Sequence, residues 1–129
     1  MKVILALLAA LAALLIIGCG GGGGQGVEGR LKSQINYFNG GDLRALYETC
    51  SSSWRAVNGF DSFKSNLQLG LAAAGLTGKT FEVTDIRVEE RGMVASAAYT
   101  TKVDGTPVDV EEGERWVKEG DVWYQESFG

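Results

Sequence analysis

The chain has 129 residues, of which 16 are acidic, 12 are basic and none is histidine, so its formal net charge at pH 7 is −4. This length permits one small domain, and no basic stripe is present to neutralise the phosphates of a nucleic acid. Without histidine the chain lacks the commonest general base and the commonest nitrogen ligand of metals, and two cysteines cannot assemble a metal-binding cluster. The sequence therefore predicts no metal, no cofactor and no nucleic-acid partner.

The first 18 residues form an apolar leader. Lys2 is their only charged residue, and residues 3–18 are rich in Leu, Ala and Ile. As a helix these sixteen residues would span about 24 Å, which is short of the ~30 Å hydrocarbon core of a bilayer. No cluster of positive charge follows them. The pattern indicates an export signal over residues 1–18 that is cleaved from the mature protein.

The leader ends in Ile16-Ile17-Gly18-Cys19, which resembles the lipobox of bacterial lipoproteins. The resemblance implies that the thiol of Cys19 is acylated, that Cys19 becomes the new N-terminus, and that the exported protein is anchored by lipid to the cell membrane or the outer membrane. Two or three acyl chains anchor a protein stably, since each buried methylene contributes about 0.8 kcal/mol. Residues 19–26 would then be the lipidated cysteine and a flexible glycine-rich tether. The alternative is an ordinary signal peptide or a short membrane helix in which Cys19 is incidental.

Helical spacing follows the tether. The apolar residues of the first predicted helix are Val27, Leu31, Ile35 and Phe38. Asn39-Gly40-Gly41 is expected to end this helix and Asp42 to cap the next. The apolar stripe of the second helix consists of Leu43, Leu46, Tyr47 and Cys50. Because Cys50 continues that stripe, it is interpreted as a small core residue, with a reactive or intermolecular thiol as the alternative.

The next segment is interrupted before it becomes helical again. Ser51-Ser52-Ser53 breaks the apolar pattern, and residues 54–59 are expected to form a loop or a short strand. A third helix is predicted from Asp61 or Ser62 to about Ala74. Its buried face would consist of Phe63, Leu67, Leu71 and Ala74.

From Thr80 onward the apolar period is two, which indicates strands. A change of phase predicts a bulge near Thr84-Asp85. Turns at 91–92, 104–107 and 119–121 separate strands that reach 103, 118 and 128. One face of the second strand would hold Met93, Ala95, Ala97, Tyr99 and Thr101. The predicted fold class is α+β, with N-terminal helices packed on a curved four-stranded antiparallel sheet, in one domain over residues 27–129.

This order of elements is similar to the nuclear transport factor 2-like superfamily, and closest to its small bacterial lipoprotein branch of undefined function. The cues are Asn39-Gly40-Gly41-Asp42 between the first helices and Lys118-Glu119-Gly120-Asp121 before Trp123 in the last hairpin. The resemblance implies a cone in which the sheet curls around the helices and leaves an apolar pocket at the open end. Some members catalyse reactions there, whereas many others only bind ligands or partners.

Two functions are therefore carried forward. The favoured one is a non-catalytic envelope module that binds an apolar small molecule or an envelope protein. The alternative is a small pocket enzyme of the ketosteroid isomerase or polyketide cyclase type, which needs a carboxylate base and hydroxyl donors in an apolar site. Its candidate residues are Tyr37, Asp85 and Tyr99. No catalytic dyad is recognised from spacing, so no catalytic residue is assigned.

The remaining candidates are aromatic or acidic. Residues predicted to line a pocket or a dimer surface are Trp54, Tyr99, Trp116, Trp123 and Tyr124. Neighbouring positions 123 and 124 must face opposite sides of the sheet, so one of them is free to meet a second copy of the chain. The acidic run Glu111-Glu112-Gly113-Glu114 is interpreted as a solvated strand, because alternate residues point to opposite faces and cannot converge on calcium.

Overall fold

A computed structural model describes residues 26–128. The predictions for the leader, for Cys19 and for most of the glycine-rich tether therefore lie outside the described residues. The elements, in chain order, are α2 (Val27–Gly40), α3 (Leu43–Tyr47), α4 (Ser52–Val57), α5 (Phe60–Ala74), β1 (Phe81–Arg91), β2 (Val94–Val103), β3 (Thr106–Glu119) and β4 (Val122–Gln125). The α+β class is confirmed.

A glycine ends helix α2 and the aspartate that follows it begins helix α3. Gly41 adopts the left-handed conformation, with a φ of 79°, and closes α2. The side chain of Asp42 then accepts a hydrogen bond of 3.1 Å from the backbone N–H of Ala45 and caps α3. Asn39 joins this corner to the sheet, since its side chain donates to the carbonyl of Phe81 and accepts from the N–H of Phe81.

Two predictions for the later helices are wrong. Residues 52–57 form helix α4 rather than a loop or strand, because the hydroxyl of Ser51 accepts from the N–H of Trp54 and so begins a helix. Helix α5 begins at Phe60, and Phe63, Leu67 and Leu71 are buried as predicted. Ala74 is exposed, because it lies in the last turn of α5, beyond the part that packs on the core.

The sheet is an antiparallel meander in the order β1-β2-β3-β4. The predicted bulge in β1 is confirmed, since the register shifts between Thr84 and Arg87 and Asp85 has a φ of 56°. Met93 does not share the buried face of β2, because it lies in the turn before that strand and is 57% exposed.

Strand β4 is shorter than predicted. It ends at Gln125, whose backbone N–H donates to the carbonyl of Thr49 and whose carbonyl accepts from the N–H of Ser51. The segment that follows α3 therefore pairs with the outer edge of β4 and fastens the helical layer to the sheet.

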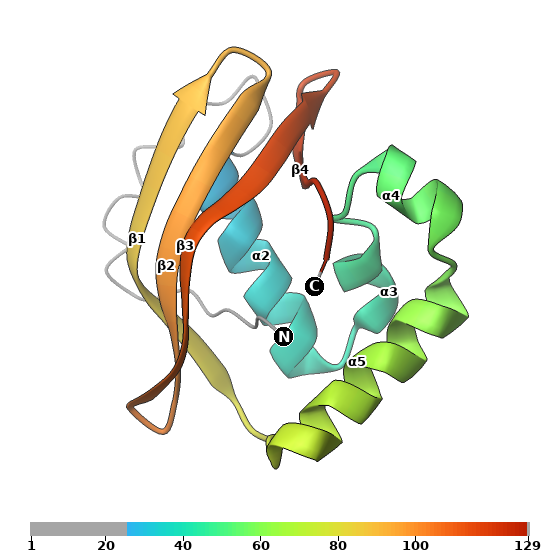
Figure 1. Cartoon of the computed structure of the whole chain (residues 1–129), viewed down its shortest axis with the longest axis vertical. Coiled ribbons are helices and arrows are strands. Elements are labelled where there is room, and N and C mark those ends of the chain that lie inside the picture. Colours follow the sequence, from blue (N-terminus) through green and yellow to red (C-terminus); the bar gives the residue numbers. More distant parts are fainter. Residues whose placement is uncertain (1–25, 129) are drawn as a thin grey trace.

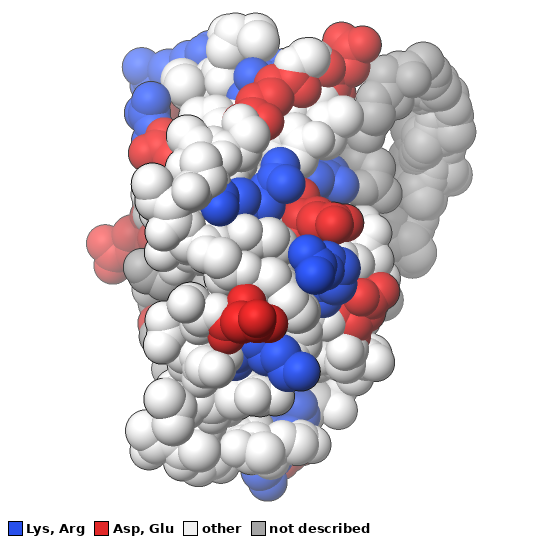
Figure 2. All heavy atoms as spheres, turned by 90° about the vertical axis from the view of Figure 1, so that its right-hand side faces the viewer, with Lys and Arg blue, Asp and Glu red and all other residues white. Residues whose placement is uncertain are grey.

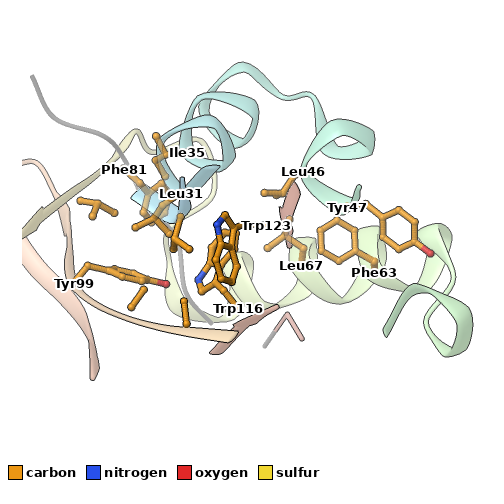
Figure 3. Close-up of a cluster of buried hydrophobic side chains, with 14 of the residues drawn as sticks. Leu31, Ile35, Leu46, Tyr47, Phe63, Leu67, Phe81, Tyr99, Trp116 and Trp123 are labelled. Carbon is orange, nitrogen blue, oxygen red and sulfur yellow. The ribbon is translucent and has the colours of Figure 1, made fainter. Parts of the chain in front are cut away.

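Helix α2 packs on the inner face of the sheet. Helices α3, α4 and α5 lie on the side of α2 that faces away from the sheet (Figure 1). The buried side chains form one hydrophobic core (Figure 3). The part between α2 and the sheet contains Leu31, Ile35, Phe81, Tyr99, Trp116 and Trp123. The part along α5 contains Leu46, Tyr47, Phe63 and Leu67.

Candidate functional site

The predicted aromatic residues do not form one surface. Tyr99, Trp116 and Trp123 are buried in the core between α2 and the sheet. Trp54 is half-buried on α4, where its ring packs edge-on against Phe63 at a centroid distance of 6.0 Å. The structure thus joins three of the five candidates in the interior and places Trp54 in the helical layer.

Tyr124 is half-buried, whereas its neighbour Trp123 is fully inside. Two guanidinium groups cover the Tyr124 ring, with the carbon of Arg30 at 5.2 Å and that of Arg55 at 6.0 Å from the ring centroid. These cation–π contacts pack two charged groups against the ring. The use of Tyr124 in a homodimer stays a prediction.

A carboxylate links Tyr99 to Trp116. The hydroxyl of Tyr99 donates to Oε2 of Glu114 at 2.8 Å, and the indole N–H of Trp116 donates to Oε1 at 3.1 Å. The side-chain amide of Gln125 also donates to Oε2, at 3.0 Å. Glu114 is only 6% exposed, so it is a buried acid held by three donors from three strands.

Predicting Glu114 as part of a solvated strand was wrong. In the β2–β3 register, Ala97 is paired with Glu114 and Tyr99 with Glu111, so one extra residue of β3 lies between these pairs. The bulge turns Glu111 and Glu114 to the same inner face. The sequence did contain a signal for the burial of Glu114. Residues two apart on a strand share a face, so Glu114 lies on the same face as Trp116.

The polar contacts continue from Glu114 across the interior. Gln125 accepts, through Oε1, a hydrogen bond of 2.7 Å from the side-chain amide of Gln34 on α2. The same amide donates to the hydroxyl of Thr49 at 2.8 Å, and that hydroxyl donates to the carbonyl of Leu46. Buried polar groups that are paired in this way fix the mutual position of helix and sheet.

The inner face of β3 is acidic near Tyr99. Register pairs place Asp109 opposite Thr101 and Glu111 opposite Tyr99, on the same face as Glu114. Burial, and then the negative charge of Glu114 with smaller effects of Glu111 and Asp109, raises the pKa of Tyr99 far above its ordinary value. The hydroxyl of Tyr99 therefore keeps its proton and donates it in the hydrogen bond to Glu114.

A cavity of about 290 Å³ lies at the end of this acidic face, between α5 and strands β1 to β3. Its lining residues are Gly70, Ala74, Leu76, Phe81, Thr101, Val108 and Asp109. Figure 1 shows the end of α5 and the β2–β3 turn at the same end of the molecule. Two buried oxygens of this lining, Oγ1 of Thr101 and Oδ2 of Asp109, have no hydrogen-bond partner.

A second hollow is an open groove of about 670 Å³ along α5 and the α2–α3 corner. Leu67 and Leu71 contribute to its apolar floor, and Arg44, Lys64 and Lys79 to its rim. Figure 2 shows basic and acidic side chains interspersed over the face presented by the helices, without one continuous patch of either sign. The groove lacks buried unpaired atoms among its described residues, so the cavity is the more specific candidate.

The three residues considered for an isomerase-like reaction are not assembled. Asp85 is exposed at the bulge of β1, where it accepts from the hydroxyl of Thr84. Tyr99 is buried and its hydroxyl proton is directed to Glu114, whereas Tyr37 is half-buried on α2. The exposed carboxylate of Asp85 therefore does not share the environment of the buried phenol of Tyr99.

Within residues 26–128, no group of three His, Cys, Asp or Glu side chains is arranged to hold a metal ion. None of the helices in that part of the chain is long and apolar enough to cross a membrane.

Cys50 is completely buried and is not in a disulfide. Burial raises the pKa of its thiol from 9.0 to about 12; the charge of Arg55 opposes this shift and that of Glu114 adds to it. Only the thiolate is an effective nucleophile. These properties fit the interpretation of Cys50 as a core residue.

The raised pKa of Cys50 predicts a loss of stability in alkali. Between pH 9.0 and about 12 the unfolded chain loses the thiol proton while the folded chain keeps it, so the free energy of unfolding falls as the pH rises. The contribution is at most ~1.4 kcal/mol for each pH unit. Urea unfolding of the wild type and of Cys50→Ala across this range should show the smaller pH dependence in the variant; equal dependences would contradict the assignment.

No protein-family model matches this chain, and no curated protein matches it either.

Proposed function

We propose that the mature chain is a lipid-anchored envelope protein whose domain binds a small molecule without catalysing its conversion. The leader and Cys19 support the anchor, through their likeness to a lipobox. The helices followed by a curved four-stranded meander support a nuclear transport factor 2-like cone. The resemblance to that superfamily implies an apolar pocket at the open end of the cone, where many members bind ligands or partners.

The observation that carries the binding proposal is the cavity beside Thr101 and Asp109. It has an apolar wall formed by Leu76, Phe81 and Val108 and a polar wall with two unpaired buried oxygens. Apolar walls with a few convergent polar groups are typical of small-molecule sites. A buried polar atom without a partner costs free energy that a bound molecule can recover.

The position of the cavity suits a tethered receptor. Helix α2 continues directly from the tether, and its first half lies by β4, where Arg30 donates to the carbonyl of Trp123. The cavity lies near the other end of α2. Asn39, at that end of the helix, donates a hydrogen bond to the carbonyl of Phe81, which lines the cavity. A domain held at residue 26 would therefore present the cavity away from its point of attachment, because the end of α5, which contributes to the lining, and the β2–β3 turn lie at the end of the molecule opposite the start of α2 (Figure 1).

Filling the cavity should abolish binding. The protein isolated from its native host under non-denaturing conditions is expected to show a retained small molecule in its native mass spectrum. Ala74→Trp places an indole at the cavity wall and should remove that mass. Ala73→Trp is the matched control, because Ala73 is exposed on the same helix and does not line the cavity. Retention by Ala74→Trp, or a wild type without any retained mass, would contradict the proposal.

A further inference from the structure

Thr101 and Asp109 form a cross-strand pair with a buried, unpaired oxygen on each side chain. Their Cα atoms are register partners on β2 and β3, so their side chains leave the sheet on the same face. Thr101 is 1% exposed, yet its hydroxyl has no hydrogen-bond partner. Oδ2 of Asp109, on the same cavity wall, is also buried and unpaired.

These two oxygens define what a ligand must offer. A carboxylate accepts hydrogen bonds and donates none when it is ionised, and a buried ionised carboxylate is costly unless it is paired. The lining of the cavity contains no Lys or Arg that could neutralise Asp109. Glu111 and Glu114 lie on the same face of β3 and add negative potential. A cation with at least two N–H donors would satisfy both oxygens and compensate the carboxylate.

We propose that this cavity binds a small organic ammonium ion, a primary amine with a compact apolar body. This inference rests on the proposed binding function and names its ligand class. One N–H of the ammonium donates to Oδ2 of Asp109 and another to Oγ1 of Thr101. The apolar body packs on Leu76, Phe81 and Val108, and Gly70 and Ala74 leave room for it under α5.

Other ligand charges fit this wall less well. A neutral alcohol has a single O–H donor and leaves the charge of Asp109 uncompensated. A carboxylate ligand would meet the charge of Asp109 with the same sign. Charge-assisted hydrogen bonds are about twice as strong as neutral ones, so the ammonium should be preferred strongly over the alcohol of the same shape.

The test compares three probes of one shape: benzylammonium chloride, benzyl alcohol and sodium benzoate. Each is titrated into the mature chain, residues 19–129 carrying Cys19→Ser so that no lipid is attached, and amide chemical shifts are followed by NMR. Benzylammonium should shift the resonances of Thr101, Asp109 and Leu76 in a saturable manner. Benzyl alcohol should bind about tenfold more weakly or worse, since its single O–H donor leaves one oxygen unpaired and the charge of Asp109 uncompensated, and benzoate should not bind.

Matched variants locate the interaction. Asp109→Asn keeps the shape of the side chain, removes its charge, and should weaken benzylammonium binding about tenfold or more. Glu112→Gln makes the same change of charge at an exposed position of the same strand and should leave binding unchanged. Thr101→Val should weaken the binding of benzylammonium, because the second acceptor is lost.

The outcomes separate the two proposals. If benzyl alcohol binds at the cavity as tightly as benzylammonium, or if Asp109→Asn binds benzylammonium like the wild type, the ammonium preference is wrong while small-molecule binding stands. If benzylammonium does not bind, the ammonium proposal is overturned. Absence of a retained ligand in the protein from its host would overturn the binding function itself.

Discussion

Glu114→Ala is expected to lower the free energy of unfolding by about 3–5 kcal/mol, which is a large share of the stability of a small domain. The change leaves three buried donors without their acceptor: the hydroxyl of Tyr99, the indole N–H of Trp116 and the side-chain amide of Gln125. It also opens a cavity in the core beside Trp116, which is 0% exposed. Urea unfolding followed by tryptophan fluorescence measures the effect.

Two further variants make the Glu114 result specific. Glu112→Ala removes an exposed carboxylate from the same strand and should change the free energy of unfolding by less than ~0.5 kcal/mol. Glu114→Gln keeps the volume of the side chain but places an N–H₂ group among hydrogen-bond donors. The decrease in its free energy of unfolding should therefore lie between the decreases for Glu112→Ala and Glu114→Ala. Equal losses for Glu112→Ala and Glu114→Ala would show that the carboxylate of Glu114 is not buried among these donors.

Cys19→Ser is expected to abolish acylation of the protein completely, because the proposed acyl chains are attached at Cys19. A serine hydroxyl cannot carry a thioether-linked diacylglyceryl group. Metabolic labelling with palmitate in a bacterial host should therefore mark the wild type and leave Cys19→Ser unlabelled, and the variant should either keep its uncleaved leader or, once cleaved elsewhere, appear in the soluble fraction.

Cys50→Ala is the matched control for this substitution. It removes the other cysteine of the chain, which is buried in the domain, and should leave both the label and the membrane association intact. Label that persists in Cys19→Ser, or that disappears in Cys50→Ala, would contradict lipidation at Cys19.

Local patterns predicted the elements well. The conformational preferences of glycines and capping residues depend on only a few neighbouring residues. The end of α2 at Gly41, the cap at Asp42 and the bulge at Asp85 could therefore be predicted from the sequence. Helix α4 was missed because its N-cap, Ser51, lies in a serine run that resembles a loop and because the helix buries no residue completely.

The candidate site was less predictable, because it depends on pairing between strands. Alternation within β3 alone places Glu111 and Glu114 on opposite faces, and only the bulge opposite Ala97 and Tyr99 brings them together. Asp109 and Thr101 are eight residues apart in sequence and meet through the β2–β3 register. No single-strand pattern contains that information.

The claim that this domain is held at a membrane by lipid is tested most directly by the intact mass of the mature protein from its native host. The predicted result is a chain that begins at Cys19 and carries the added mass of a diacylglyceryl group, with or without an amide-linked acyl chain. A mature chain with an unmodified thiol at Cys19, or one that begins at another residue, would contradict it.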